Sequence, residues 1–189
     1  VPLAPGSQPV PVAPGAAPAA PTAPAAPMAL PPGVFAAERD IALATAGTYA
    51  LDETHTAVIA RVSHLGYSHS IFRFDRAKGK LTWDPAAIEK SKIEASVETA
   101  SITSNVKGFA EELAGDKFLK SREFPQASFV STVFKPTDKM RGKVEGQFTL
   151  MGKTKPVTFD VSLVGAGKGF GGKPRIGVTA VATINPQDY

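Results

Sequence analysis

The chain has 189 residues, a net charge of +4 and no cysteine. It therefore has room for one ordinary domain plus a tail, and disulfides, thiolate metal sites and cysteine nucleophiles are excluded. Its 21 lysines and arginines are scattered among 17 acids without a long basic run, so we expect no nucleic-acid partner, and no stretch approaches the roughly 18 continuous apolar residues of a membrane-spanning helix.

The N-terminal segment, residues 1–33, is of low complexity and holds eleven of the seventeen prolines but no charged residue. Such a Pro/Ala composition cannot bury a core and favours extended polyproline II. We predict an extended arm that is either an inert spacer or an element that docks along a partner. Residues 34–47 are predicted to connect it to the folded domain, with a short helix over 34–46 that has Phe35, Ala42 and Leu43 at apolar positions and ends at Gly47.

From Thr48 onward the sequence predicts β-strands. The run from His55 to Leu65 is rich in β-branched and apolar residues, and its alternation places Val58, Ala60, Val62 and His64 on one face. About eight such strands separated by turns are typical of a barrel or sandwich. The other predicted strands are Ile71–Phe74, Lys80–Asp84, Lys92–Glu98, Ala127–Phe134, Met140–Leu150, Val157–Leu163 and Ile176–Ile184.

Turns are predicted where glycine, proline and aspartate cluster between these runs. One helix interrupts the strands between Ser104 and Gly115, with Asn105 as its N-cap, and it is expected to plug or cover one end of a barrel. Its apolar face comprises Val106, Phe109, Ala110 and Leu113. The predicted turns are Lys78–Gly79, Asp84–Pro85, Pro136–Asp138, Met151–Lys153 and Gly165–Gly167.

Several strands carry apolar residues on both faces. Phe129 and Val133 alternate with Val130 and Phe134. A barrel of about eight strands has an interior that holds either packed side chains or one slender ligand. The pattern alone leaves both interiors open.

Five blocks of the sequence resemble, in order and at similar spacing, the YceI-like family of bacterial periplasmic proteins. The first contains the sequence Y-A-L-D-E-T-H-T and the second R-V-S-H-L-G-Y-S, and the last reads T-I-N-P-Q-D-Y. The blocks are residues 48–56, 61–68, 118–129, 146–157 and 183–189.

The resemblance implies an all-β fold for residues 48–189: a lipocalin-like antiparallel β-barrel with one short inserted helix, preceded by the Pro/Ala-rich arm. It also implies a non-catalytic protein whose interior binds a long apolar amphiphile, such as a polyisoprenoid lipid or a quinone, with no required cofactor. Family members are usually exported, so we expect a periplasmic location. The start at Val1 fits a removed signal peptide or a truncated chain equally well.

The residues expected to line the ligand site come from the Val58 face, from the helix block and from later strands. His64 is the one polar member, and we expect it either to donate a hydrogen bond to a quinone carbonyl or to make a structural hydrogen bond. The predicted ligand-binding residues are Val58, Ala60, Val62, His64, Phe72, Phe74, Leu113, Phe118, Phe124, Phe129 and Phe148.

Two departures from the family pattern bear on this expectation. Phe72 stands where the family commonly has glycine, and a bulky residue there would narrow the cavity or reshape a bulge. The family also continues with another strand or two after the last block, whereas this chain ends at Tyr189. We therefore expect either a chain that has been cut short or a sheet completed by a partner strand.

Functions of other classes have weaker support. An enzyme or metal site would start from Asp52, His55, His64 and His69, but the histidines are separated by odd offsets, which on one strand point to opposite faces. No catalytic motif and no carboxylate–histidine spacing of note is apparent. A compatible alternative is an accessory subunit of a membrane-bound complex, such as a redox complex, that docks through residues 1–33.

Overall fold

The protein was analysed as a computed structural model, which describes Pro31 and residues 36–189. All of the predicted arm except Pro31 lies outside the described residues, as does Phe35 of the connecting segment. The arm, and the accessory-subunit hypothesis that depends on it, therefore stay predictions.

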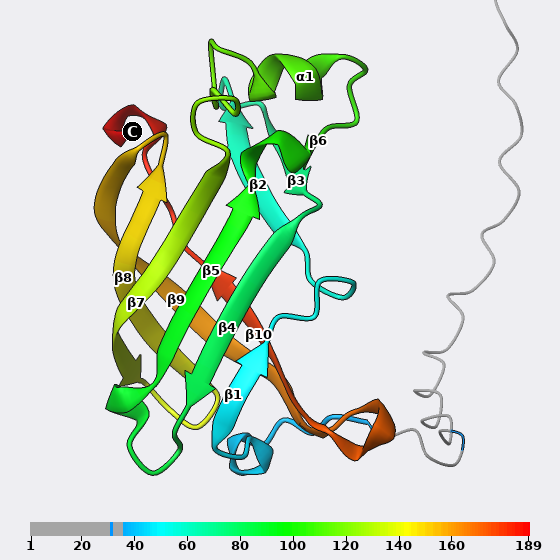
Figure 1. The fold of residues 1–189 in the computed structure, drawn as a ribbon, viewed down its shortest axis with the longest axis vertical. Coiled ribbons are helices and arrows are strands. Elements are labelled where there is room, and N and C mark those ends of the chain that lie inside the picture. The colour runs from blue at the N-terminus through cyan, green and yellow to red at the C-terminus, as the bar shows by residue number, and fades with distance from the viewer. Residues whose placement is uncertain (1–30, 32–35) are drawn as a thin grey trace, which may run out of the picture. The chain divides into compact units, whose positions relative to one another are not determined.

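The described residues form two antiparallel sheets. The larger has the strand order β1-β4-β5-β7-β8-β9-β10 and curls into a nearly closed barrel, and the smaller has the order β2-β3-β6 (Figure 1). This architecture confirms the predicted fold class. The strands are β1 Gly47–Ala50, β2 Val58–His64, β3 Ser68–Phe74, β4 Ala77–Trp83, β5 Lys92–Glu98, β6 Ile102–Thr103, β7 Gln126–Pro136, β8 Arg141–Leu150, β9 Lys153–Lys168 and β10 Pro174–Val181.

The inserted helix is α1, Phe109–Ala114. It begins later than predicted: Gly108, with φ of 79°, is the N-cap, and the proposal of Asn105 was wrong. A left-handed glycine cannot continue a right-handed helix, so residues 105–108 form a turn instead. The remaining helical elements are 3₁₀ turns at Ile41–Leu43, Ile88–Lys90, Thr99–Ser101, Phe170–Gly172 and Pro186–Asp188.

The helix predicted over residues 34–46 was also wrong in its described part, where only Ile41–Leu43 is helical. The main chain of Glu38 instead pairs with Ala166 of β9, through hydrogen bonds of 3.0 and 2.8 Å. That pairing fixes an extended backbone in which a helix cannot begin. Gly47, expected to end the helix, is the first residue of β1.

A bulge in β7 regroups the apolar residues of that strand, so that the phenylalanines share the inner face while Val130 and Val133 are exposed on the outer one. The register with β8 shifts between Ser131 and Val133, so that Thr132 is an extra residue. Phe129 lies opposite Phe148 before the bulge, and Phe134 lies opposite the buried Val144 after it. Because one extra residue reverses the alternation, both phenylalanines point to the inner face of the barrel.

Two of the predicted turns lie inside strands instead. Gly79 belongs to β4, and Gly165 belongs to β9. A Cβ atom at Gly165 would come within 2.7 Å of the Ala37 Cβ, and one at Gly79 within 3.2 Å of the Glu94 carbonyl oxygen. These glycines therefore permit a close approach of neighbouring chain segments and do not mark turns.

Residues 36–46 cover one end of the barrel, which we call the closed end. Ala44, Leu163 and Ala166 form a buried cluster there, and Trp83 and Ile176 pack against it. The indole N–H of Trp83 donates to the carbonyl oxygen of Ala44 at 3.1 Å. The first described segment, β4 and β9 are thereby joined around one small core.

Candidate functional site

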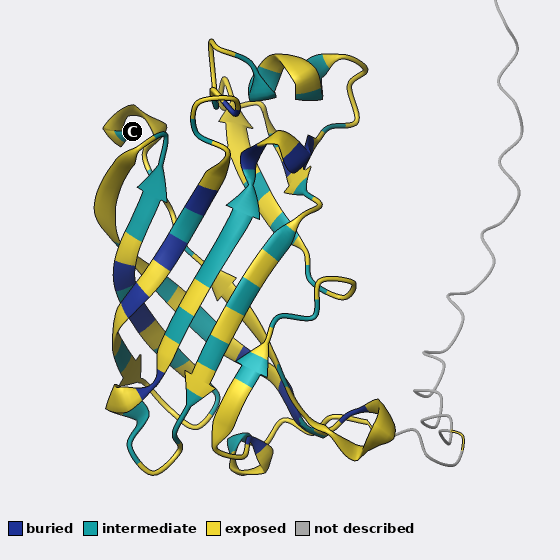
Figure 2. Ribbon diagram, viewed as in Figure 1, coloured by how far each residue is buried: buried dark blue, intermediate teal, exposed yellow. Residues whose placement is uncertain are grey.

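Alternate residues of the barrel strands face inward, as the burial pattern shows (Figure 2). On β7, Ala127 and Phe129 are buried, and Phe129 lies opposite Ala95 of β5 and Phe148 of β8. The Phe129 and Phe159 rings meet edge to face, with centroids 4.8 Å apart. The predicted residues Phe129 and Phe148 are therefore neighbours on one apolar inner wall.

Gly146 lets the Phe129 ring lie flat along this wall. A Cβ atom at Gly146 would come within 2.5 Å of the Phe129 Cζ and 2.3 Å of the Val130 carbonyl oxygen. Any larger residue would push the ring further into the barrel. The strand thus uses glycine to keep the aromatic ring out of the centre.

The β2–β3 hairpin brings the predicted Val58 face together with the two predicted phenylalanines. Val58 lies opposite Phe74 and Ala60 lies opposite Phe72. Phe72 is buried, whereas Val58, Ala60 and Phe74 are half-buried. The opposite face, which includes Ile59, is exposed, so the predicted face is the inner one.

This inner face becomes more open toward the turn between β2 and β3. Val62, opposite Ser70, is 45% exposed, and His64, opposite Ser68, is exposed as well. His64 therefore lies at the solvent-exposed end of the inner face, called here the opening, and shares that face with Val58, Ala60 and Val62. His69 lies opposite Ser63 on the outer face, as the odd spacing from His64 predicts.

The helix block supplies a cover at the same end of the barrel. The ring of Phe109 in α1 packs edge-on against Phe72, with centroids 5.8 Å apart. Phe72 thus anchors α1. Of the other predicted residues, Leu113 is half-buried, Phe118 is exposed, and the ring of Phe124 lies against Gly152 in the β8–β9 turn.

Many of the inward-facing apolar side chains are not fully buried. Among the described residues only eight apolar side chains are buried, and three of these belong to the closed end. A close-packed interior would bury the inward-facing side chains almost completely. Several apolar residues at inward-facing positions are instead only half-buried: Val58, Ala60, Phe74, Leu81, Ile93, Val97, Phe148 and Phe159.

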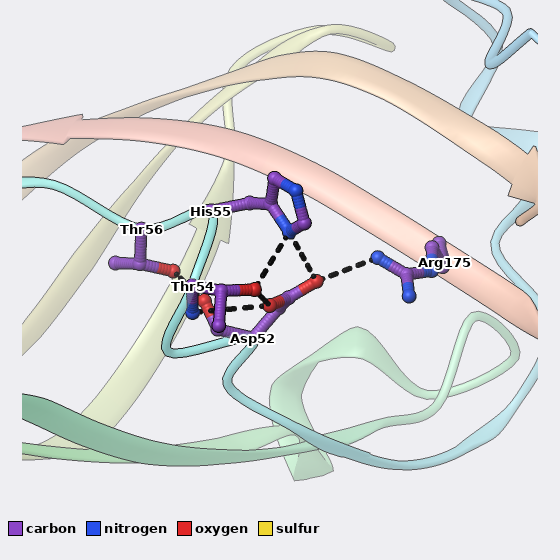
Figure 3. Close-up of polar contacts among 5 residues, drawn as sticks. All are labelled: Asp52, Thr54, His55, Thr56 and Arg175. Atoms are coloured by element: carbon purple, nitrogen blue, oxygen red, sulfur yellow. Dashed lines mark hydrogen bonds and ion pairs between the residues drawn. The ribbon is translucent and has the colours of Figure 1, made fainter.

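A second feature, which we call the clasp, consists of Asp52, Thr54, His55 and Arg175 (Figure 3). The Asp52 carboxylate accepts hydrogen bonds from the Thr54 hydroxyl at 2.7 Å and from Arg175 Nη1 at 2.7 Å. Asp52 Oδ2, the atom that accepts from Arg175, also lies 3.0 Å from His55 Nδ1. Asp52 follows β1 and Arg175 belongs to β10. The clasp therefore joins the two edge strands of the seven-stranded sheet.

The electrostatics of the clasp favour the ionised carboxylate. The Thr54 hydroxyl, the Arg175 guanidinium and the His55 imidazole hold the pKa of Asp52 well below its ordinary value. Thr54 also donates its main-chain N–H to Asp52 at 3.2 Å, which makes the loop a local Asx turn. The carboxylate therefore remains a charged hydrogen-bond acceptor over the physiological pH range.

The sequence predictions missed the clasp. They found no noteworthy carboxylate–histidine spacing, yet Asp52 and His55 are in contact. The D-x-T sequence, typical of an Asx turn, was the local signal. No signal pointed to Arg175, which lies 123 residues away.

The clasp has few features of a catalytic or metal site. The His55 side chain is 79% exposed, and no group of three or more potential ligands that could hold a metal occurs in the part of the chain described.

None of the helices among residues 36–189 has the length and apolar character needed to cross a bilayer.

Comparisons with known proteins agree with the architecture. A UPF0312 protein of Pseudomonas putida strain W619 is 40% identical over 148 residues, which cover 77% of each chain. The Campylobacter jejuni YCEI protein superposes with a TM-score of 0.60 at 28% identity, covering 74% of this chain and 82% of that one. Burkholderia cenocepacia BcnA shares the fold, with a TM-score of 0.56 at 24% identity over 60% of this chain and 70% of its own.

The family model described as the YceI-like domain matches residues 49–189. That range takes in the five sequence blocks almost completely, together with all strands from β2 to β10. This chain belongs to the YceI-like domain family.

Proposed function

We propose that the barrel binds one long apolar chain in its interior and performs no reaction on it. The observation that carries the proposal is the inner wall of apolar side chains that remain half-buried. Each methylene moved from water into such a space contributes roughly 0.8 kcal/mol. A chain of several isoprene units therefore binds well even after the cost of ordering it.

The aromatic side chains of the inner wall favour a slender ligand over a compact one. Phe129 and Phe159 occupy the wall edge to face, and Gly146 keeps the Phe129 ring close to the strand. The apolar inner face of the β2–β3 hairpin leads toward the exposed positions of Val62 and His64. A polyisoprenoid lipid or a quinone has the matching form, an apolar tail with one polar head, and the family resemblance supports the same class.

His64 is the residue that we assign to the polar head. It is exposed at the opening and shares the inner face with Val58, Ala60 and Val62. An imidazole can donate to a quinone carbonyl or accept from a hydroxyl. An exported, periplasmic location is part of the proposal and is supported by the resemblance alone.

The decisive experiment is native mass spectrometry with lipid extraction on the purified protein, followed by reloading with ubiquinone or a polyprenol. We expect a bound lipid that extraction removes and reloading restores. A protein that is empty on purification and remains empty when offered both ligands would contradict the proposal.

Paired variants then locate the ligand. Ala60→Phe fills the interior and should abolish loading, whereas Ile59→Phe, one residue along on the outer face, should leave it unchanged. His64→Ala should weaken retention of a quinone more than that of a head-less hydrocarbon, with His69→Ala on the outer face as its control. Equal retention in His64→Ala and the unmodified protein would remove the role of His64.

A further inference from the structure

We propose that the β2–β3 hairpin docks on the surface of an anionic lipid bilayer, inserting the side chains of its turn. The docking surface, called here the hairpin face, is defined by its turn residues and the outer residues of its two strands. It consists of Ile59, Arg61, Leu65, Tyr67, Ile71 and Arg73.

The turn of this hairpin carries a residue that neither its backbone geometry nor the packing of the fold favours. Leu65 and Gly66 have φ of 51° and 78°, which are the left-handed values of a tight hairpin turn that favours Asn-Gly. Leucine is unfavourable there, and this one is 81% exposed, next to Tyr67 at 91%. A bulky apolar side chain that neither packs nor suits its backbone indicates a function outside the fold.

The outer face of the strands combines apolar and cationic side chains. Ile59 lies opposite Arg73, and Arg61 lies opposite Ile71. Both isoleucines are exposed. Arginine can keep its charge in the headgroup layer while its methylene stem covers apolar surface, so these pairs fit the boundary between lipid headgroups and acyl chains.

The charge of the hairpin complements anionic lipid. No aspartate or glutamate occurs from residue 54 to residue 74, whereas Arg61 and Arg73 do. Arg73 is paired with Asp75 at 2.9 Å, but Arg61 takes part in no ion pair among the described residues. The strands around the β7–β8 turn differ, because Lys135 pairs with Glu145 and Arg141 pairs with Asp138.

The position of the hairpin face suits a lipid surface. Figure 1 shows the end of β2 and α1 at the same end of the barrel. Val106 and Phe118, on either side of α1, are exposed apolar residues as well, although the charges around this helix are balanced. A projecting turn with an exposed apolar tip can insert into a deformable bilayer without a matching cavity.

The docking inference goes beyond ligand binding and does not need it. If the interior does hold a lipid, docking would place the opening near Val62 and His64 against the membrane. The test is flotation of the purified protein with two kinds of vesicle, phosphatidylcholine alone and phosphatidylcholine mixed with phosphatidylglycerol. We expect binding to the mixed vesicles that weakens as salt is raised, because salt screens exposed charges.

Three variants test the assignment to the hairpin face. Leu65→Asn combined with Tyr67→Ser should reduce binding to mixed vesicles by about tenfold or more, since two apolar contacts are lost. Arg61→Gln should remove most of the preference for anionic lipid. Val130→Ser is the control, because Val130 is 48% exposed on the outer face of β7 but lies opposite the acidic Glu94 of β5, and it should leave binding unchanged.

Failure of vesicle binding in the unmodified protein, or unchanged binding in the double variant, would overturn the inference. Circular dichroism establishes that each variant is folded. Lipid extraction from the same preparations separates the two proposals. A protein that stays empty when offered both ligands but still floats with mixed vesicles retains the docking inference and contradicts the interior ligand, whereas a loaded protein that never floats does the reverse.

Discussion

The closed end of the barrel and the tip of the β2–β3 hairpin are built from opposite kinds of surface. At the closed end, Ala44, Leu163 and Ala166 are at most 5% exposed, and an indole hydrogen bond and a main-chain bridge fasten the first described segment to β4 and β9. At the hairpin tip, Leu65 and Tyr67 project from a turn into solvent. The difference lies in packing: the closed end buries a cluster of apolar side chains, whereas the hairpin turn holds apolar side chains that pack against little of the fold.

The largest effect should come from the closed end. Leu163→Ala leaves a cavity in the buried cluster and should lower the free energy of unfolding by about 2–4 kcal/mol, measured by urea denaturation. Val164→Ala, at the neighbouring exposed position, is the control and should change it by less than about 0.5 kcal/mol. Similar values for both variants would break the comparison between the two ends.

An intermediate effect should come from the clasp. Asp52→Asn removes the charge that Arg175 and His55 share, and it should lower the melting temperature at neutral pH by a few degrees, roughly. Because the pKa of Asp52 is depressed in the folded protein, its contribution is fully present above the unfolded value of about 3.9 and is lost as the pH falls through the lower folded value.

Thermal unfolding across a pH series checks this expectation. The difference between Asp52→Asn and the unmodified protein should stay constant near neutral pH and shrink in strong acid. Asp160→Asn, which breaks a more exposed pair with Lys143, should have a smaller effect at every pH. A difference in melting temperature that grows on acidification would contradict this expectation.

The smallest effect on stability should come from the hairpin turn. Leu65→Asn replaces an exposed, left-handed leucine by a residue that tolerates this conformation. The free energy of unfolding should stay the same or rise by up to about 1 kcal/mol. A clear loss of stability would show that Leu65 serves the fold and would weaken the assignment of this end to function.

Local alternation was sufficient to predict several strands, but not the features that depend on distant residues. Strand β5 was predicted with the bounds that the structure has, because Ile93, Ala95 and Val97 alternate regularly with outward-facing residues. The bulge at Thr132 conceals the alternation in β7. Gly79 and Gly165 were mistaken for turn residues because their role, close contact with another segment, is set by tertiary structure.

The candidate site was predicted in part for the same reason. The alternation in β2 placed Val58, Ala60, Val62 and His64 on one face, and the register with β3 adds Phe72 and Phe74. The position of Phe124 against Gly152, and the pairing of Asp52 with Arg175, depend on how distant strands meet. The hydrophobic periodicity of one strand carries no information about which distant residues that strand contacts.

The clasp has a kinetic consequence. Within the described residues the edge strands β1 and β10 are joined to each other by side chains and not by main-chain hydrogen bonds. Each of the inner strands, such as β7, is held by main-chain hydrogen bonds along both of its sides. Amide protons along this seam should therefore exchange with solvent sooner than those of β7 and β8, and the wall of the barrel would separate there first.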